Sequence, residues 1–241
     1  MSVHLVGGGW SPDSAPEVYG AFIIEALERG LGSGREHPRI AIIAVRTGDA
    51  EEHAEKLVSV LSAGGTFDAH VTTIAEGAEL PATALTDVDG IVIGGGLTPA
   101  YNAAVAPLAD EIRRQVAAGV PYLGFSAGSA IAAERAIVGG WRIGDVAVCP
   151  EDASEDLDEV TVQQGIGLLD VSIDVHAAQW GTVPRLIAAA EAGLIDGGVA
   201  IDEDTVLVVG MGEGGLVVSG AGSVWRAIPA ETGVLVSTLG A

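Results

Sequence analysis

Basic residues, cysteine and aromatic side chains are all scarce in this sequence of 241 residues. Cys149 is the only cysteine, which excludes an intrachain disulfide and any Cys-x-x-Cys metal or redox motif. Lys56 is the only lysine, so no Gly-Lys-Ser/Thr phosphate loop exists, and a pyridoxal enzyme would have to use a lysine inside a helical pattern. Lysine and arginine number 11 against 33 aspartates and glutamates, for a net charge of −22. A field of this sign repels nucleic-acid phosphates and anionic membranes, so neither is expected as a partner.

Long apolar runs are missing as well. No stretch reaches the roughly 18 apolar residues of a membrane-spanning helix without a glycine or a charge interrupting it. The first ten residues, MSVHLVGGGW, lack the basic and apolar regions of a secretory signal. Residues of the AVILMFWYC set still make up 49% of the chain, which is enough for a large core and excludes a disordered protein. We therefore expect a folded, cytoplasmic protein.

Short apolar runs alternate with helix-period segments over the first two thirds of the chain. The runs predict strands at residues 3–6, 39–45, 67–74, 88–93 and 121–125. The segments between them predict helices within residues 15–29, over 51–63, from Pro99 and over 127–133. This alternation is typical of the α/β class, and it predicts a doubly wound, mostly parallel sheet flanked by helices.

The pattern changes after residue 150. Residues 151–159 form an acidic run, EDASEDLDE, which predicts a solvated loop. Strands are expected at residues 171–175 and 198–202, on either side of a helix over 183–192. Three further strands, at residues 205–209, 215–219 and 223–228, are separated by glycine turns and predict a small C-terminal β-meander. No linker divides the chain, so we expect a single domain over residues 1–241.

Two glycine clusters directly follow predicted strands, at the edge of a parallel sheet where ligands gather. Neither residues 7–9 nor residues 94–96 extend to a Gly-x-Gly-x-x-Gly motif, so a dinucleotide fingerprint is absent. The first cluster is equally well explained as a tight turn at a strand end, without a role in ligand binding. The second leads into a helix for which Thr98 is the predicted N-cap, so its free N–H groups could face an anion or an oxyanion.

The segment Gly124-Phe125-Ser126-Ala127-Gly128 is the only Gly-x-Ser-x-Gly of the chain. An apolar strand is predicted before it and a small-residue helix after it, which is the setting of a nucleophile elbow. In such an elbow a tight turn lifts the serine hydroxyl off the sheet. The alternative is that Ser126 only caps the following helix. The strand–turn–helix setting favours the nucleophile.

A serine nucleophile needs a base, and the base needs an orienting acid. His176 is the only histidine after the elbow, and it ends a predicted strand at the same sheet edge. A lone histidine can also be a structural residue. The next strand ends in Asp202, Glu203 and Asp204, so the chain order is Ser, His, acid, whereas α/β-hydrolases have Ser, acid, His. Glutamine amidotransferases place cysteine at the elbow, and Cys149 lies outside it, which argues against glutaminase chemistry.

Five features together resemble the cyanophycinase and aspartyl dipeptidase (peptidase E) family of serine peptidases, which has the class I glutamine amidotransferase-like, flavodoxin-like fold. They are the LVGGG start, the Gly-Gly turn before Thr98, the elbow continued by Ser129-Ala130, the Asp174-x-His176 strand end and the Ile201-Asp202-Glu203 strand end. Each is weak singly, but together they are specific and they cover nearly the whole chain.

The resemblance implies a role for each matching position. Ser126 corresponds to the nucleophile, His176 to the general base and Glu203 to the acid that orients it. The amides of Gly95, Gly96 and Ala127 correspond to the oxyanion hole, which stabilises the tetrahedral intermediate. Substrate contacts are implied for Thr98, Asp174, Trp180 and Arg185. Such an enzyme works through an acyl-enzyme and needs neither a metal nor an organic cofactor.

Several positions depart from the family pattern. Leu97 and Thr98 stand where cyanophycinases have Asn and Gln, and Val175 replaces another Gln. Trp180 and Thr182 occupy two positions of an arginine-rich run, of which Arg185 remains. Arginine forks recognise carboxylates, so we expect a cyanophycinase-like enzyme that cleaves a small peptide or isopeptide-like amide but not cyanophycin itself. The alternatives are a catalytically silent binding protein of the same fold and an esterase or amidase acting on an apolar acyl group. A homodimer is also compatible with the sequence.

Overall fold

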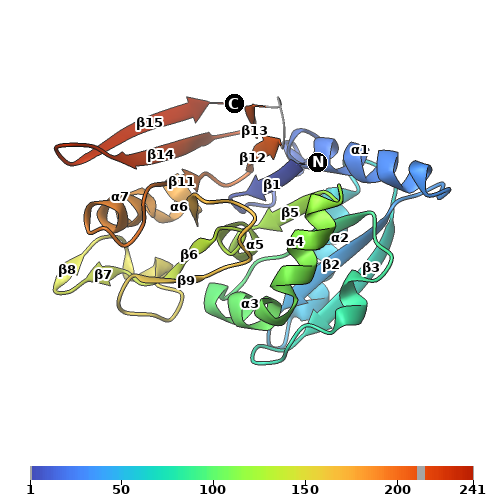
Figure 1. Cartoon of the computed structure of the whole chain (residues 1–241), viewed down its shortest axis with the longest axis horizontal. Helices are drawn as coiled ribbons and strands as arrows, with labels where there is room; N and C mark the ends of the chain where they lie inside the picture. The colour runs from blue at the N-terminus through green and yellow to red at the C-terminus, as the bar shows by residue number, and fades with distance from the viewer. Residues whose placement is uncertain (1, 211–214, 241) are drawn as a thin grey trace.

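Five parallel strands form the centre of the main sheet of the computed structural model, which describes residues 2–210 and 215–240 (Figure 1). In spatial order they are β1 (Ser2–Val6), β5 (Tyr122–Phe125), β4 (Gly90–Ile93), β2 (Arg39–Val45) and β3 (Asp68–Ile74). Two antiparallel strands, β12 (Thr205–Gly210) and β13 (Leu216–Gly220), extend the sheet beyond β1. The predicted strands of the first half are therefore present and parallel.

Strand β2 shows how the sequence builds two layers around this sheet. Ile40, Ile42 and Ala44 point to the face covered by α1 (Ala15–Gly32) and α2 (Ala50–Leu61). Their neighbours Ala41, Ile43 and Val45 point to the opposite face, which is covered by α3 (Thr98–Val105), α4 (Ala109–Ala117) and α5 (Ala127–Ala130). Because both faces are buried, the strand is apolar from Ile40 to Val45 and does not alternate with polar residues. The doubly wound α/β class is confirmed.

A second sheet of four strands packs beside the first. Its order is β10 (Ser172–Val175), β11 (Gly198–Ile201), β14 (Ser223–Pro229) and β15 (Val234–Gly240). The first pair is parallel, and the helices α6 (Ala177–Trp180) and α7 (Val183–Glu191) lie between these two strands in the sequence. Residues of β10, β11 and β14 belong to the same apolar cluster as the main sheet, so one core spans both sheets.

The predicted C-terminal meander is wrong. Strands β12 and β13 pair in the main sheet, whereas β14 pairs with β11 and with β15, a strand that the sequence pattern did not predict. The Asp202 carboxylate explains the change of sheet, because it accepts hydrogen bonds from the Ser223 amide and the Trp225 indole N–H. These bonds attach the beginning of β14 to the end of β11.

Short elements connect the two sheets. Strands β6 (Arg135–Gly139) and β9 (Thr161–Gln164) form one antiparallel pair, and β7 (Arg142–Ile143) and β8 (Val146–Ala147) form another. Three 3-10 turns complete the described elements, namely η1 (Ala82–Leu85), η2 (Ala106–Leu108) and η3 (Glu151–Ala153). The acidic run predicted as a loop contains η3 and continues toward the edge of the main sheet.

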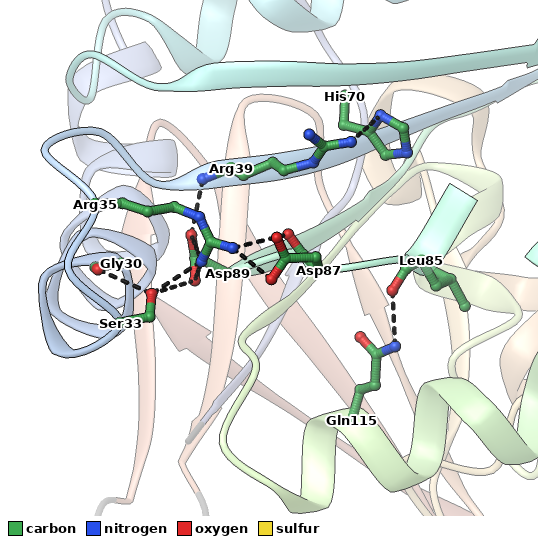
Figure 2. Close-up of polar contacts among 9 residues, drawn as sticks. All are labelled: Gly30, Ser33, Arg35, Arg39, His70, Leu85, Asp87, Asp89 and Gln115. Atoms are coloured by element: carbon green, nitrogen blue, oxygen red, sulfur yellow. Dashed lines mark hydrogen bonds and ion pairs between the residues drawn. The ribbon is translucent and has the colours of Figure 1, made fainter. Parts of the chain in front are cut away.

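A polar cluster at the amino ends of the strands joins α1 to the sheet (Figure 2). The buried Asp89 carboxylate accepts hydrogen bonds from the Arg35 guanidinium, at 2.9 Å, and from the Arg39 amide, also at 2.9 Å. Arg35 also forms an ion pair with Asp87. Since these polar groups bind one another, we assign the cluster a structural role, and we place the chemistry at the opposite, carboxyl edge of the sheet.

Candidate active site

Ser126 occupies a sharp turn between β5 and α5. Its φ of 52° and ψ of −111° are unusual for a residue with a side chain, and such strain costs about 1–3 kcal/mol. The flanking glycines permit the turn, because a Cβ on Gly128 would lie 2.1 Å from the Ile93 carbonyl and one on Gly124 would lie 2.5 Å from Gly128. The spacing Gly-x-Ser-x-Gly therefore has a direct steric reason here.

The structure brings Ser126, His176 and Glu203 together. Ser126 Oγ lies 2.8 Å from His176 Nε2, and His176 Nδ1 lies 2.7 Å from Glu203 Oε1. Because a carboxylate only accepts hydrogen bonds, Nδ1 carries the proton and Nε2 is free to accept one from the serine. Both Ser126 and His176 are buried, with exposed fractions of 7% and 6%.

The backbone holds His176 in this position. The residue has a left-handed φ of 53°, and its amide donates to the Gly7 carbonyl at 3.0 Å. Gly8 lies directly against the imidazole, since a Cβ there would come within 2.1 Å of His176 Cε1. On the other side the Trp180 indole stacks on the ring. The first glycine cluster, which the sequence left open, thus provides a surface for the imidazole.

Burial lowers the pKa of His176 below its ordinary value, and the hydrogen bond and charge of Glu203 oppose that effect. The net direction favours a neutral imidazole near pH 7. A neutral imidazole next to a serine hydroxyl can accept its proton, which is the requirement for general-base chemistry.

Glu203 is flanked by two carboxylates with other contacts. Asp202 accepts from the Ala178 amide, in addition to its bonds with β14, and Asp204 accepts from the Ser11 amide. The Glu203 amide itself donates to the side-chain oxygen of Gln179 at 2.9 Å. Of the three acids that follow β11, Glu203 is therefore the one that meets the histidine.

The expected oxyanion donors separate into two groups. The Gly95 amide donates to His53 Nε2 at 3.1 Å and is thus occupied. The Gly96 and Ala127 amides donate to no acceptor within residues 2–210 and 215–240. Gly95 still contributes by its size, because a Cβ there would lie 2.8 Å from the Ser126 Cβ. The expectation for Gly95 as a donor is corrected, and Gly96 and Ala127 are the available amides next to Ser126.

The expected substrate contacts of Asp174 and Arg185 are wrong. The Arg185 guanidinium donates to both oxygens of Asp174, at 2.9 and 2.7 Å, and also to the carbonyls of Gly140 and Ala153. Exposed fractions of 2% for Asp174 and 4% for Arg185 place the pair in the protein interior. Asp174 lies on β10 and Arg185 on α7, so the ion pair joins these two elements. The hydrogen bond from Arg185 to the Ala153 carbonyl also attaches the acidic segment to the fold.

Thr98 is also buried and does not line the cleft. Leu97 occupies the N-cap position of α3, and Thr98 is the first helical residue, which corrects the predicted cap. Its amide donates to Glu155 Oε2 at 2.8 Å. The carboxyl group of Glu155 is thereby brought to the end of the cleft, and burial raises its pKa. The acidic segment is therefore packed against the site rather than merely solvated.

A cleft of about 660 Å³ lies over Ser126, within the usual range of small-molecule sites. It opens at the carboxyl ends of β2, β4 and β5, next to the point between β2 and β4 where the strand order reverses. Of the expected substrate-binding residues, Trp180 lines it and is 42% exposed. Trp10, Leu97 and Phe125 add apolar surface. Six carboxyl side chains also line the cleft, those of Asp49, Glu52, Glu151, Asp152, Glu155 and Asp156.

Arg46 and Lys56 are the basic residues of the cleft wall, and each is neutralised by a neighbour. Arg46 pairs with Asp49 at 2.7 Å, and Lys56 pairs with Glu52 at 2.9 Å. Within the described chain, the acids of the segment over residues 151–156 have no such basic partner at the cleft. Asp49, His53 and residues 151–156 were missed as site residues, since they have no motif and only the fold brings them to Ser126.

The comparisons with known proteins agree with this geometry. The model of peptidase family S51 matches residues 20–215, and the chain belongs to this family of serine peptidases, the peptidase E family. The chain is thus a peptidase by family. Among curated proteins no relative matches significantly.

Two solved structures share the fold. A peptidase from an acI-B1 Actinobacterium is 19% identical, with a TM-score of 0.63 over 100% of this chain and 96% of its own. A candidate peptidase E protein from Listeria monocytogenes EGD-e is 15% identical, with a TM-score of 0.55 over 92% of this chain and 98% of its own. At these identities the likeness supports the fold alone.

Two further observations concern the described residues. Among them, no helix combines the length and the apolar character needed to cross a membrane. Within the same residues, no three histidine, cysteine or acidic side chains are arranged to hold a metal ion.

Proposed function

We propose that the protein is a serine peptidase that cleaves an amide bond of a short peptide or peptide-like substrate through an acyl-enzyme. The observation that supports this most directly is the hydrogen-bonded series Ser126–His176–Glu203, of which Ser126 and His176 line the cleft. A helix cap needs no histidine beside it. The strained backbone of Ser126, which the fold must stabilise elsewhere, also favours a functional serine.

Each residue has one task in the proposed reaction. Ser126 Oγ attacks the scissile carbonyl carbon while His176 Nε2 takes the hydroxyl proton. Glu203 holds the imidazole by its Nδ1–H and stabilises the imidazolium that forms. The amides of Gly96 and Ala127 stabilise the oxyanion. The imidazolium then gives its proton to the leaving amine, and water hydrolyses the resulting ester by the same base.

The charge of the cleft supports a substrate class. Three carboxyl groups of the acidic segment, Glu151, Asp152 and Asp156, face the cleft without a basic partner in the described chain. A substrate carboxylate would be repelled there, and the net charge of −22 adds to the repulsion. We therefore propose a substrate with a positive charge, such as a free α-ammonium or a basic side chain, and an apolar group that packs on Trp180.

Active-site labelling tests the reaction class. We expect a fluorophosphonate probe to label the wild-type protein and to leave Ser126→Ala unlabelled, with Ser62→Ala as a control at an exposed serine outside the cleft. Turnover of the best substrate in a dipeptide library, including arginyl, lysyl and β-aspartyl compounds, should fall by at least about 10³-fold in Ser126→Ala. A folded wild-type protein that neither labels nor hydrolyses any library member would make it a catalytically silent binding protein. Hydrolysis of acyl esters without any peptide would support an esterase.

A further inference from the structure

The peptide group between Gly95 and Gly96 is held from its carbonyl side by two side chains. The Gly95 carbonyl accepts one hydrogen bond from Arg46 Nη1, at 3.0 Å, and one from the Tyr101 hydroxyl, at 2.9 Å. The preceding peptide is held as well, since the Gly95 N–H donates to His53 Nε2. Three side chains from two helices and one strand end thus fix a turn of glycines that has little rigidity of its own.

The hydrogen bonds on the carbonyl determine where the Gly96 N–H points. The peptide is trans, so its C=O and N–H are directed to opposite sides of the same rigid plane. Because the carbonyl points at Arg46 and Tyr101, the N–H points away from them. Gly96 lines the same cleft as Ser126, and its N–H has no acceptor in the described chain.

We propose that Arg46 and Tyr101 are positioning residues of the reaction, which orient and polarise the Gly95–Gly96 peptide so that the Gly96 N–H is a preorganised donor to the oxyanion. This proposal rests on the proposed serine peptidase function. It assigns a task to two residues that do not touch the serine and that no motif marks.

Arg46 is itself fixed in the orientation that this task requires. Its Nε and Nη2 donate to the Asp49 carboxylate, at 3.0 and 2.7 Å, which leaves Nη1 directed at Gly95. A guanidinium that donates to a carbonyl draws electron density from the peptide and strengthens its N–H as a donor. Asp49 also lies at the N-cap position of α2, so the helix start fixes the arginine.

Tyr101 is suited to remain a hydroxyl donor. The side chain is fully buried in the core between β2 and α3, and burial raises its pKa far above neutrality. Its phenol therefore stays protonated near neutral pH and can donate to the Gly95 carbonyl. The glycine at position 96 is required by the same packing, because a Cβ there would lie 3.0 Å from the Tyr101 ring and 2.9 Å from Arg46 Nη1.

The test separates oxyanion stabilisation from substrate binding. Tyr101→Phe removes only the hydroxyl, and Arg46→Gln removes the charge at a half-exposed position, where the fold depends on it less. Tyr19→Phe, at another buried tyrosine outside the cleft, is the matched control. We expect Tyr101→Phe to lower kcat about tenfold and Arg46→Gln to lower it more. Both losses should stay below the roughly 10²–10³-fold of removing an oxyanion donor itself.

The second readout is a peptide aldehyde, which forms a hemiacetal with the serine and uses the oxyanion donors. We expect its affinity to fall in the same proportion as kcat, with KM of the substrate changed less than threefold and with Tyr19→Phe unchanged. Unaltered kcat and aldehyde affinity in folded Tyr101→Phe and Arg46→Gln would overturn the proposal. So would a rise of KM that accounts for the whole loss. If the wild type itself has no turnover that Ser126→Ala abolishes, the proposed function has failed rather than the positioning role.

Discussion

The imidazole of His176 lies flat against the indole of Trp180, with ring centroids 3.8 Å apart and planes 7° from parallel. Trp180 belongs to the short helix α6, whose N-cap residue is His176, so one local segment supplies the ring and the surface that supports it. Gly8 also lies against the imidazole. The imidazole therefore contacts a backbone turn and an aromatic plane, with its two nitrogens directed at Ser126 and Glu203.

This stacking predicts an effect of Trp180 on turnover. A stacked aromatic pair contributes about 0.5–1.5 kcal/mol beyond its buried area, which corresponds to up to about tenfold in rate. We expect Trp180→Ala to lower kcat by roughly this factor. Trp180→Phe, which keeps an aromatic ring, should retain most of the wild-type kcat. Steady-state kinetics with one dipeptide substrate measure both. An unchanged kcat in Trp180→Ala would show that the stack does not position the base.

Glu203 and Asp202 provide a matched pair of substitutions. Glu203→Gln replaces the carboxylate that accepts the His176 Nδ1 proton by a neutral amide, which no longer stabilises the imidazolium and can donate to Nδ1 in the wrong tautomer. We therefore expect kcat to fall by about 10³-fold or more with the fold intact. Asp202→Asn weakens the contacts to Ser223 and Trp225 and should lower thermal stability with a smaller effect on kcat. Thermal unfolding and steady-state kinetics of both variants test which of the two acids orients His176. A folded Asp202→Asn with the larger kinetic defect would shift the assignment by one residue.

The lowered pKa of His176 sets the pH profile. The base must be neutral to take the serine proton, so activity is lost as pH falls through its pKa. Because burial lowers this value, we expect the acidic limb of kcat/KM to have its midpoint below about 6.5, the ordinary pKa of histidine. In Glu203→Gln, which removes the group that raises the pKa, the residual activity should persist to still lower pH. A midpoint above 7 in the wild type would contradict a lowered pKa of His176.

The buried Arg185–Asp174 pair predicts a loss of stability rather than of binding. Arg185→Leu leaves the Asp174 carboxylate buried without its partner, which costs about 3–5 kcal/mol. We expect this loss in the free energy of unfolding by urea. Under conditions where the variant is folded, KM should change little, because neither residue lines the cleft. A large rise in KM with an unchanged free energy of unfolding would instead support a role of Arg185 in substrate binding.

The acidic segment predicts a preference for cationic substrates. Replacing Glu151 by Gln and Asp152 by Asn removes two exposed charges of the cleft wall. We expect kcat/KM to fall about three- to tenfold for a cationic dipeptide amide and to stay nearly constant for a neutral one of the same size. The wild-type preference should also weaken as salt is raised, since the Debye length shortens from about 10 Å at 0.1 M to about 3 Å at 1 M. Equal effects on both substrates would remove the electrostatic basis of the proposed substrate class.

Much of the parallel core could be read from the sequence, because the evidence is local. Strand β2 is apolar on both faces from Ile40 to Val45, and Ala54, Leu57 and Leu61 recur at helical spacing in α2. The elbow is local as well, since its glycines and Ser126 lie within five residues. The ends of neighbouring parallel strands meet at one edge, which accounts for His176 and Glu203 lying together after β10 and β11. Their approach to Ser126 depends on how this second sheet packs against the first, because β5 belongs to the other sheet.

Only the tertiary structure decided which side chains the cleft receives. Arg185 and Asp174 look the same in sequence whether they face a substrate or each other, and their burial depends on how α7 packs on β10. The split of the C-terminal strands between two sheets depends on the contact of Asp202 with β14, more than twenty residues along the chain. The acidic segment and Arg46 reach Ser126 through long-range packing, which no periodicity or motif encodes. The sequence by itself determined most of the helices and strands of the parallel core and the carboxyl edge at which chemistry occurs, because periodicity and strand ends are local. Contacts between distant elements determined which residues occupy that edge of the sheet, and with which partners.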